Sequence, residues 1–128
     1  MRAPSIERDG WCLDDGEERH SAAPETFWIP SLEARQGLYP GCGVKLIFRI
    51  DTPSGDEVER MWVVVTRRES DGERYMGVLD NTPASDFAPG RLEPGFEVPF
   101  EPRHVIDVDL SCDATMAVAE TEPARRWS

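Results

Sequence analysis

The sequence has few of the residues by which catalytic and metal-binding proteins are usually recognised. It contains two histidines and a single lysine, Lys45. Its three cysteines, Cys12, Cys42 and Cys112, form no CxxC pair and have no histidine at zinc-finger spacing. An odd number of widely separated cysteines argues against a disulfide framework and a structural metal, and indicates reduced thiols in a cytoplasmic protein.

Long hydrophobic runs are also absent. No stretch approaches the roughly 20 apolar residues that a membrane-spanning helix needs. The first residues, MRAPSIERDGW, contain no apolar region of the kind found in secretion signals. We therefore expect a soluble protein that does not associate with membranes.

Signatures of catalysis are lacking as well. The paired carboxylates of a glycosidase, a glycine loop that cradles phosphate and an ordered Ser-His-Asp set do not occur at their usual spacings. We therefore expect no metal and no cofactor, and a non-catalytic role is favoured over an enzymatic one.

Positive charge is scarce relative to negative charge. The chain has 25 acidic and 14 basic residues, a formal net charge of −11. Acidic residues outnumber basic ones in residues 1–25, 26–110 and 111–128 alike, so most of the molecule repels nucleic-acid backbones and anionic membranes. A basic protein partner is compatible with this charge, and so is the simpler explanation that the charge maintains solubility.

What is present is the composition of one folded domain. A chain of 128 residues that is 39% hydrophobic can bury a sizeable core. Residues 1–26 are rich in Asp, Glu, Pro and Ala without a sustained period, so we predict a flexible acidic leader in which Trp11 docks locally. Residues 27–110 form the predicted domain. Residues 111–128 are predicted to be a C-terminal tail with a small helix over 116–119.

Two elements begin the predicted domain. Ser31 can cap a short helix over residues 32–36, which Gly37 would end in a left-handed conformation. The segment VKLIFRID alternates apolar and polar residues, which predicts a strand. The residues expected on its inner face are Val44, Leu46, Phe48 and Ile50.

The segment RMWVVVT carries five consecutive apolar residues. Its β-branched side chains favour a strand over residues 58–67 rather than a helix, and both faces of that strand must then be covered. Asp71 and Gly72 predict a hairpin turn into a third strand, RYMGVLD. FEVPF and HVIDVDL predict two more strands after a loop over residues 81–95. Because Pro99 has no backbone donor, the first of them lies at a sheet edge or holds Pro99 at a non-pairing position.

A repeated motif indicates the architecture. LYPGCGVKL and LEPGFEVPF share the pattern Leu-x-Pro-Gly-x-x-Val-x-apolar, a tight turn that leads into a strand. The same device at two corners suits a strongly bent sheet, although turn chemistry alone would also produce the likeness. We predict a β-dominated α+β fold, a bent antiparallel sheet or SH3-like half-barrel of about five strands with a short N-terminal helix.

Four blocks of the sequence resemble a known family. LYPGCGVKLIF, ERMWVVVT, YMGVLDNTP and LEPGFEVPFEPRHVIDV occur in the same order as in the YegJ-like family of bacterial domains of unknown function. The resemblance spans about residues 26–109. Cys42 and Phe96 stand where that family often has Asp after the turn glycine. The resemblance supports the predicted fold and implies no particular reaction.

Trp62 is the most informative side chain for binding. It shares the outer face of its predicted strand with Arg60, and we predict that the apolar triplet Phe27-Trp28-Ile29 covers this face. The alternative is that a partner supplies part of the cover, with Trp62 and Arg60 as anchors. The inner face carries Met61, Val63 and Val65.

Two hypotheses of function follow from these patterns. The leading one is a non-catalytic protein-interaction or regulatory module whose partner is a protein, and the charge permits that partner to be basic. Its candidate binding residues are Arg60, Trp62, Asp80, Asn81 and Phe87, the last from the 81–95 loop.

The alternative hypothesis is a small-ligand-binding or hydrolytic domain. It would centre on His104, the one histidine of the predicted domain, because histidine is the usual acid or base near neutral pH. Asp80 and Asn81 could contact a ligand or cation, but they also fit an Asx-type turn at the end of a strand.

Overall fold

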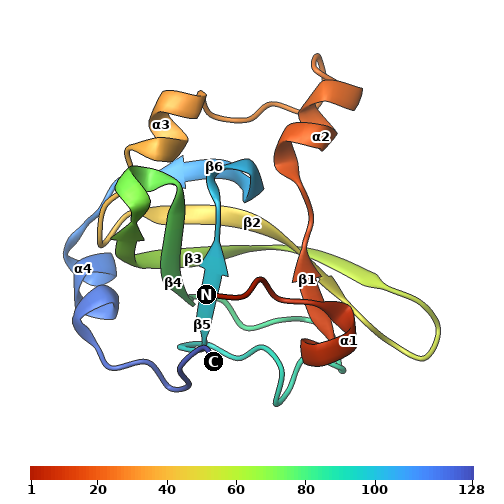
Figure 1. Ribbon diagram of the computed structural model, residues 1–128. Coiled ribbons are helices and arrows are strands. Elements are labelled where there is room, and N and C mark those ends of the chain that lie inside the picture. Colours follow the sequence, from red (N-terminus) through yellow and green to blue (C-terminus); the bar gives the residue numbers. More distant parts are fainter.

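The computed structural model describes all 128 residues. Six strands form one antiparallel sheet: β1 (Trp11–Leu13), β2 (Gly43–Ile50), β3 (Glu57–Glu69), β4 (Arg74–Leu79), β5 (Glu97–Phe100) and β6 (Val105–Asp109). β1 and β6 pair with successive parts of β2, so the sheet is five strands wide. The sheet curls until β5 lies across β2 and β3 (Figure 1). This is the predicted α+β half-barrel.

Short helices surround the sheet. They are α1 (Ile6–Asp9), α2 (Gly16–Ala22), α3 (Leu32–Gln36) and α4 (Asp113–Glu120), with 3-10 turns η1 (Ser70–Gly72) and η2 (Pro102–His104). Figure 1 shows α2 and α3 above β6 and α4 beside β3. None of these helices is long and apolar enough to cross a membrane.

The valine-rich segment is a strand buried on both faces, as predicted. Val63 and Val65 lie in the main core on the inner face. Val64 points to the opposite face and is only 1% exposed, and α4 packs against β3. β3 therefore needs no alternation of polar residues here, because protein covers both of its faces.

Most of the caps and turns predicted for residues 31–72 are present in the structure. α3 spans the predicted residues, and the Ser31 side chain accepts a hydrogen bond from the Ala34 N–H at 3.2 Å. Gly37 ends the helix at a φ of −98°, so the prediction of a left-handed residue there is wrong. The hairpin turn does use positive φ at Asp71 and Gly72, as predicted.

The two copies of the repeated motif have the same local structure. Gly41 and Gly95 have φ angles of 96° and 89°, which glycine adopts without strain. The Gly41 N–H donates to the Val65 carbonyl and the Gly95 N–H to the Leu79 carbonyl, at 2.9 and 2.8 Å. Each turn is therefore fastened to a neighbouring strand. β5 also lies at the sheet edge, as Pro99 predicted.

The prediction of a flexible leader is wrong, because residues 6–22 form α1, β1 and α2. β1 pairs with β2 from Trp11 opposite Ile50 to Leu13 opposite Phe48. Trp11 is 2% exposed and its ring centre lies 5.6 Å from that of Phe48. Elements of three to seven residues show no periodicity in the sequence, and these are held in place by packing.

The C-terminal tail also docks on the domain. The helix predicted over residues 116–119 is present but longer, and it is α4. The Trp127 ring packs edge-on against Trp11, with centres 5.7 Å apart. The Glu97 N–H donates to the Arg125 carbonyl at 2.9 Å, so the tail extends the pairing near β5. The two ends of the chain are therefore adjacent in the folded protein (Figure 1).

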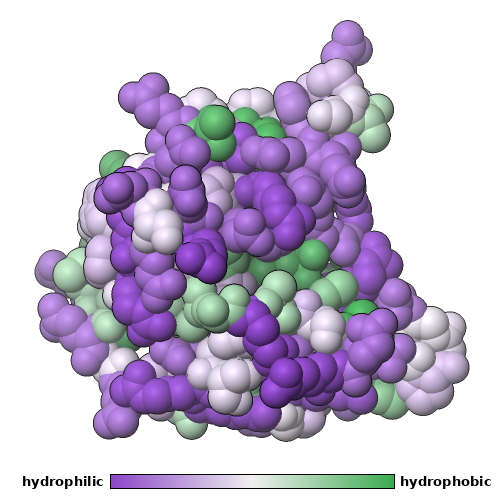
Figure 2. Space-filling model, in the orientation of Figure 1, coloured by the Kyte–Doolittle hydropathy of each residue, from purple (hydrophilic) through white to green (hydrophobic).

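The surface agrees with the composition. The face drawn in Figure 2 is predominantly hydrophilic, with one hydrophobic band across its middle. Among the large apolar residues that are exposed, Leu110 at 74% and Trp28 at 68% are the most accessible. An isolated apolar residue on a surface needs no explanation, whereas one that adjoins other aromatic and cationic groups can mark a binding surface.

Candidate functional site

The outer face of β3 carries Arg60 and Trp62 next to the only lysine. Antiparallel pairing places Lys45 of β2 opposite Trp62. Lys45 Nζ lies 5.1 Å from the centre of the Trp62 ring, and the Arg60 guanidinium lies 5.2 Å from the centre of the Phe27 ring. Neither cation forms an ion pair. Both are therefore placed by aromatic rings and not by carboxylates.

The segment between α2 and α3 supplies part of the cover that the sequence predicted. Phe27 and Ile29 are half-buried, and Phe27 lies against Arg60. No ring of the triplet stacks on Trp62, which is covered by Lys45 instead. Trp28 remains exposed at the rim of a recess of about 200 Å³ that Phe27, Lys45 and Arg60 also line.

We call this group of five side chains the aromatic-cation surface. Its members are Phe27, Trp28, Lys45, Arg60 and Trp62. The sequence predicted Arg60 and Trp62 as binding residues. It did not predict an exposed Trp28 or the role of Lys45, because exposure and cross-strand register depend on tertiary packing.

Asp80 and Asn81 lie at the end of β4, beside Trp62. The Asn81 Oδ1 accepts the Trp62 N–H at 2.5 Å, and the Asp80 N–H donates to the Trp62 carbonyl at 2.9 Å. Asn81 therefore bonds across to β3 and not to its own turn, which differs from the Asx-turn expectation. Its amide positions the strand that carries Trp62, whereas the Asp80 side chain is exposed.

Phe87 lies in the 81–95 loop, which is fastened to β3 through Glu59. The Glu59 carboxylate accepts the Ala84 and Ser85 N–H groups at 2.8 and 3.1 Å. Phe87 is 41% exposed. No hydrogen bond or ring contact joins Phe87 to Arg60 or Trp62. Glu59 lies on the opposite face of β3 from these two residues, because successive side chains of a strand point to opposite faces. The structure thus separates Phe87 from the aromatic-cation surface.

His104 lies in η2 and is 4% exposed. Its Nδ1 accepts the Glu101 N–H at 2.9 Å. Burial lowers the pKa of His104 to about 4, with a further contribution from the charge of Arg103. The imidazole is therefore neutral at physiological pH and bonded to the backbone. No hydrogen bond joins it to Asp80 or Asn81, so the structure does not assemble the predicted ligand or hydrolytic site.

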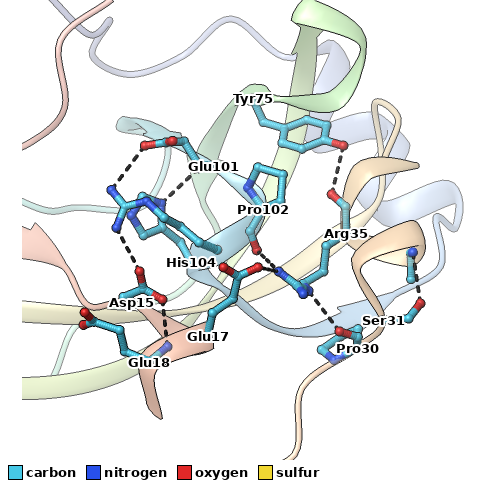
Figure 3. A network of polar contacts seen from close by, with 12 residues as sticks. Asp15, Glu17, Glu18, Pro30, Ser31, Arg35, Tyr75, Glu101, Pro102 and His104 are labelled. Carbon is cyan, nitrogen blue, oxygen red and sulfur yellow. Dashed lines mark hydrogen bonds and ion pairs between the residues drawn. The ribbon is translucent and has the colours of Figure 1, made fainter. Parts of the chain in front are cut away.

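A polar network around His104 joins three helical elements (Figure 3). The Arg35 guanidinium donates to the Pro30 and Pro102 carbonyls, both at 2.9 Å, and pairs with Glu17 at 2.6 Å. The Tyr75 hydroxyl donates to the Arg35 carbonyl at 3.0 Å. Arg103 bridges Asp15 and Glu101 next to His104. These contacts, to backbone carbonyls and to carboxylates, connect α2, α3 and η2.

A second ion network joins the start of α2 to β2. The Asp14 carboxylate accepts two hydrogen bonds from Arg49, at 2.9 and 2.8 Å, and one from Arg19 at 2.6 Å. Hydrogen bonding to Arg49 is the main cause that lowers the pKa of Asp14. Asp56 lies 3.6 Å from Arg49, so two carboxylates balance the two arginines, and we assign this cluster a role in docking α2.

Groups able to hold a metal ion or form a disulfide are not assembled. No three His, Cys, Asp or Glu side chains lie together in an arrangement that could hold a metal ion. Cys12, Cys42 and Cys112 are all free, and Cys42 is buried in the core.

Comparisons with known proteins add no relative. No protein-family model, no curated protein and no solved structure matches this chain. The resemblance to the YegJ-like family of bacterial domains therefore stays a prediction that rests on the four sequence blocks. The candidate site is consequently defined by its own geometry, and the aromatic-cation surface is its best-supported form.

Proposed function

We propose that this protein is a non-catalytic protein-interaction module that docks a protein partner on the aromatic-cation surface. The observation that carries the proposal is the exposure of Trp28, at 68%, beside two cations that form no ion pair, in a recess whose one carboxylate is that of Asp107. Tryptophan and arginine are the residue types most enriched among those that dominate interface energies. A partner that covers Trp28 would bury a large apolar ring in a single contact.

The charge of the whole molecule supports a basic partner. A net charge of −11 attracts a positively charged protein at long range and raises the rate of encounter. Lys45 and Arg60 lie within the contact itself, where backbone carbonyls or a carboxylate of the partner would accept their hydrogen bonds. In this proposal the overall charge steers the partner, and the aromatic-cation surface fixes its orientation.

We propose that the module acts in the cytoplasm. Three free thiols support this, since Cys112 is exposed. Hydrogen bonding from the Thr115 backbone is the main cause that lowers the pKa of the Cys112 thiol. A lowered thiol pKa increases the reactive thiolate fraction, so the cysteine would persist unmodified only in a reducing compartment.

The proposal is tested by capturing partners from a lysate of the native host with the tagged wild-type protein and with Trp28→Ala. Tyr39→Ala is the matched control, because Tyr39 is an exposed aromatic residue, at 47%, outside the aromatic-cation surface. We expect one or more proteins to be enriched by the wild type and by Tyr39→Ala and to be lost with Trp28→Ala.

A captured protein is then purified and mixed with each variant directly. We expect Trp28→Ala to weaken binding roughly 30-fold or more, as for a dominant interface residue, and the association rate to fall as salt is raised. Identical affinities of all three proteins for every captured candidate would refute the proposed docking surface.

A further inference from the structure

A second feature lies away from the aromatic-cation surface, where the two ends of the chain meet the 81–95 loop and the start of β5. It is a partly enclosed pocket of about 100 Å³. Five arginines line it, namely Arg2, Arg8, Arg91, Arg125 and Arg126. The side-chain carboxylates in its lining are those of Asp9 and Glu97, and Ser128, the last residue of the chain, also lines it and accepts a hydrogen bond from Arg2 Nε on its main-chain oxygen at 2.9 Å. In a chain with 25 acidic and 14 basic residues, this is a local reversal of charge.

Three of these arginines have no carboxylate partner. Arg2 pairs with Asp9 at 2.7 Å, and Arg126 lies 4.0 Å from Glu97. Arg8, Arg91 and Arg125 form no ion pair at all. Three arginines without an ion-pair partner therefore line one small space beside the carboxylates of Asp9 and Glu97, and a bound anion would reduce the repulsion among them.

Arg91 and Arg125 are nonetheless held in place. Arg91 Nη1 donates to the Asp51 carbonyl at 2.8 Å, and its guanidinium packs against Gly10, where a Cβ would lie 2.6 Å from it. Arg125 Nη1 donates to the Gly90 carbonyl at 2.6 Å, and its guanidinium lies 5.2 Å from the Phe96 ring centre. A guanidinium has five N–H groups, so each arginine is oriented by one bond and retains donors for a ligand.

The wall of the pocket supplies a further donor. Trp11 is 2% exposed, and its indole N–H has no hydrogen-bond partner. Every fully buried side-chain nitrogen in the protein does have a partner. Because Trp11 lines the pocket, we take its indole N–H as a candidate donor to a ligand bound there. An unpartnered donor on a buried ring is the arrangement expected where a ligand accepts the bond.

We propose that this pocket binds a phosphate group, either free or as the monoester end of a small molecule. The planar forks of arginine match the oxygens of phosphate, and the double negative charge of phosphate at neutral pH balances cations from three separate segments of the chain. A volume of about 100 Å³ is large enough for one such group but not for a whole nucleotide.

The proposal is tested by titrating the untagged protein with inorganic phosphate at pH 7.5, with sodium chloride adjusted to keep ionic strength constant. Binding is followed by calorimetry and by the NMR signal of the Trp11 indole N–H. Glycerol phosphate is titrated in parallel to distinguish a phosphate monoester from the free anion, and acetate tests a single negative charge. We expect saturable binding of at least one phosphate probe, a shift of the Trp11 signal, and no saturation with acetate.

Three variants locate the binding. Arg91→Gln and Arg125→Gln should each weaken phosphate binding roughly tenfold or more, the effect expected for removing a charge-assisted hydrogen bond. Arg8→Gln should weaken it as well, and it cannot do so by unfolding the protein because Arg8 is exposed and donates no side-chain hydrogen bond. Arg68→Gln is the matched control, since Arg68 also donates to a single backbone carbonyl, that of Asp71, but lies on the distant end of β3.

The opposite results would overturn the inference. They are an absence of saturation by both phosphate probes, or equal weakening in Arg68→Gln and the three pocket variants, which would indicate an unspecific charge effect. The outcome is independent of the docking surface, because Trp28→Ala should bind phosphate as the wild type does.

Discussion

At the scale of single residues, the interior of this protein contains ionisable groups whose contacts are all structural. Arg35 is 5% exposed and contacts two backbone carbonyls and one carboxylate. Tyr75 is fully buried, and its hydroxyl donates to one backbone group and accepts from another. Because burying an unpaired polar group costs about 1–3 kcal/mol, such complete pairing holds α2, α3 and η2 in one arrangement.

His104 leads to a prediction on the pH dependence of stability. Its pKa falls from 6.5 to about 4 on folding, so the unfolded chain binds the extra proton more readily. The stabilisation is complete above pH 6.5 and is lost as the pH falls toward 4. We expect the free energy of unfolding to decrease by about 2 kcal/mol between pH 7 and pH 5, measured by urea denaturation.

The control is His104→Gln, which should show a much smaller decrease over the same interval. Asp9, Asp14 and Asp15 do not obscure the effect, because their pKa values are lowered on folding and their contributions are lost only at lower pH. Equal pH dependence in the wild type and His104→Gln, or an NMR titration of His104 with a midpoint near 6.5, would contradict the assignment.

At the scale of elements, a strand of three residues completes one edge of β2. β1 occupies the part of the β2 edge that β6 leaves free. Its hydrogen bonds are few, and its position depends on Trp11, whose ring lies between Phe48 and Trp127. A short strand is stable only when it carries such a buried side chain, since isolated strands of this length do not persist in water.

We therefore predict that Trp11→Ala lowers the free energy of unfolding by about 3–5 kcal/mol, the usual range for removing a buried large ring. Trp28→Ala removes the same side chain from an exposed position and should change stability by no more than about 0.5 kcal/mol. Urea denaturation of both variants measures the difference. A Trp11→Ala protein as stable as Trp28→Ala would show that residues 1–26 are a dispensable leader after all.

At the scale of the whole molecule, the two chain ends and the sheet share one core. The Trp127 indole N–H donates to the Arg2 carbonyl at 3.1 Å, and both Trp11 and Trp127 pack toward Phe48 and its neighbours. No boundary separates the ends from the domain. The ends are thus part of one cooperative unit, and loss of either should open the core.

Cooperative unfolding of the entire chain follows as a prediction. The urea transition followed by tryptophan fluorescence, to which the buried Trp11 and the half-buried Trp127 both contribute, should coincide with that followed by far-UV circular dichroism. If the chain ends unfolded independently of the sheet, the fluorescence would change at a lower urea concentration than the circular dichroism signal of the strands. Trp28→Phe and Trp62→Phe are the controls. In each of these variants the fluorescence and circular dichroism transitions should still coincide.

The sequence by itself determined the central part of the fold. Residues with strong alternation or a continuous β-branched run predicted β2 and β3, and turn chemistry predicted the Asp71-Gly72 hairpin and the edge position of β5. These features depend on local stereochemistry and on the period of side chains along a strand, which are properties of neighbouring residues. Arg60 and Trp62 were found for the same reason, since alternation alone places them on one face.

Only the tertiary structure decided the rest. Packing on β2 and against Trp127 made residues 6–22 part of the core, and no local pattern records that burial. Cross-strand register placed Lys45 over Trp62, and folding removed His104 from solvent. The phosphate-sized pocket combines arginines from positions 2 to 126, so its charge arises where segments far apart in the sequence meet. Contacts between such segments depend on the whole fold, which is why sequence reasoning did not find them.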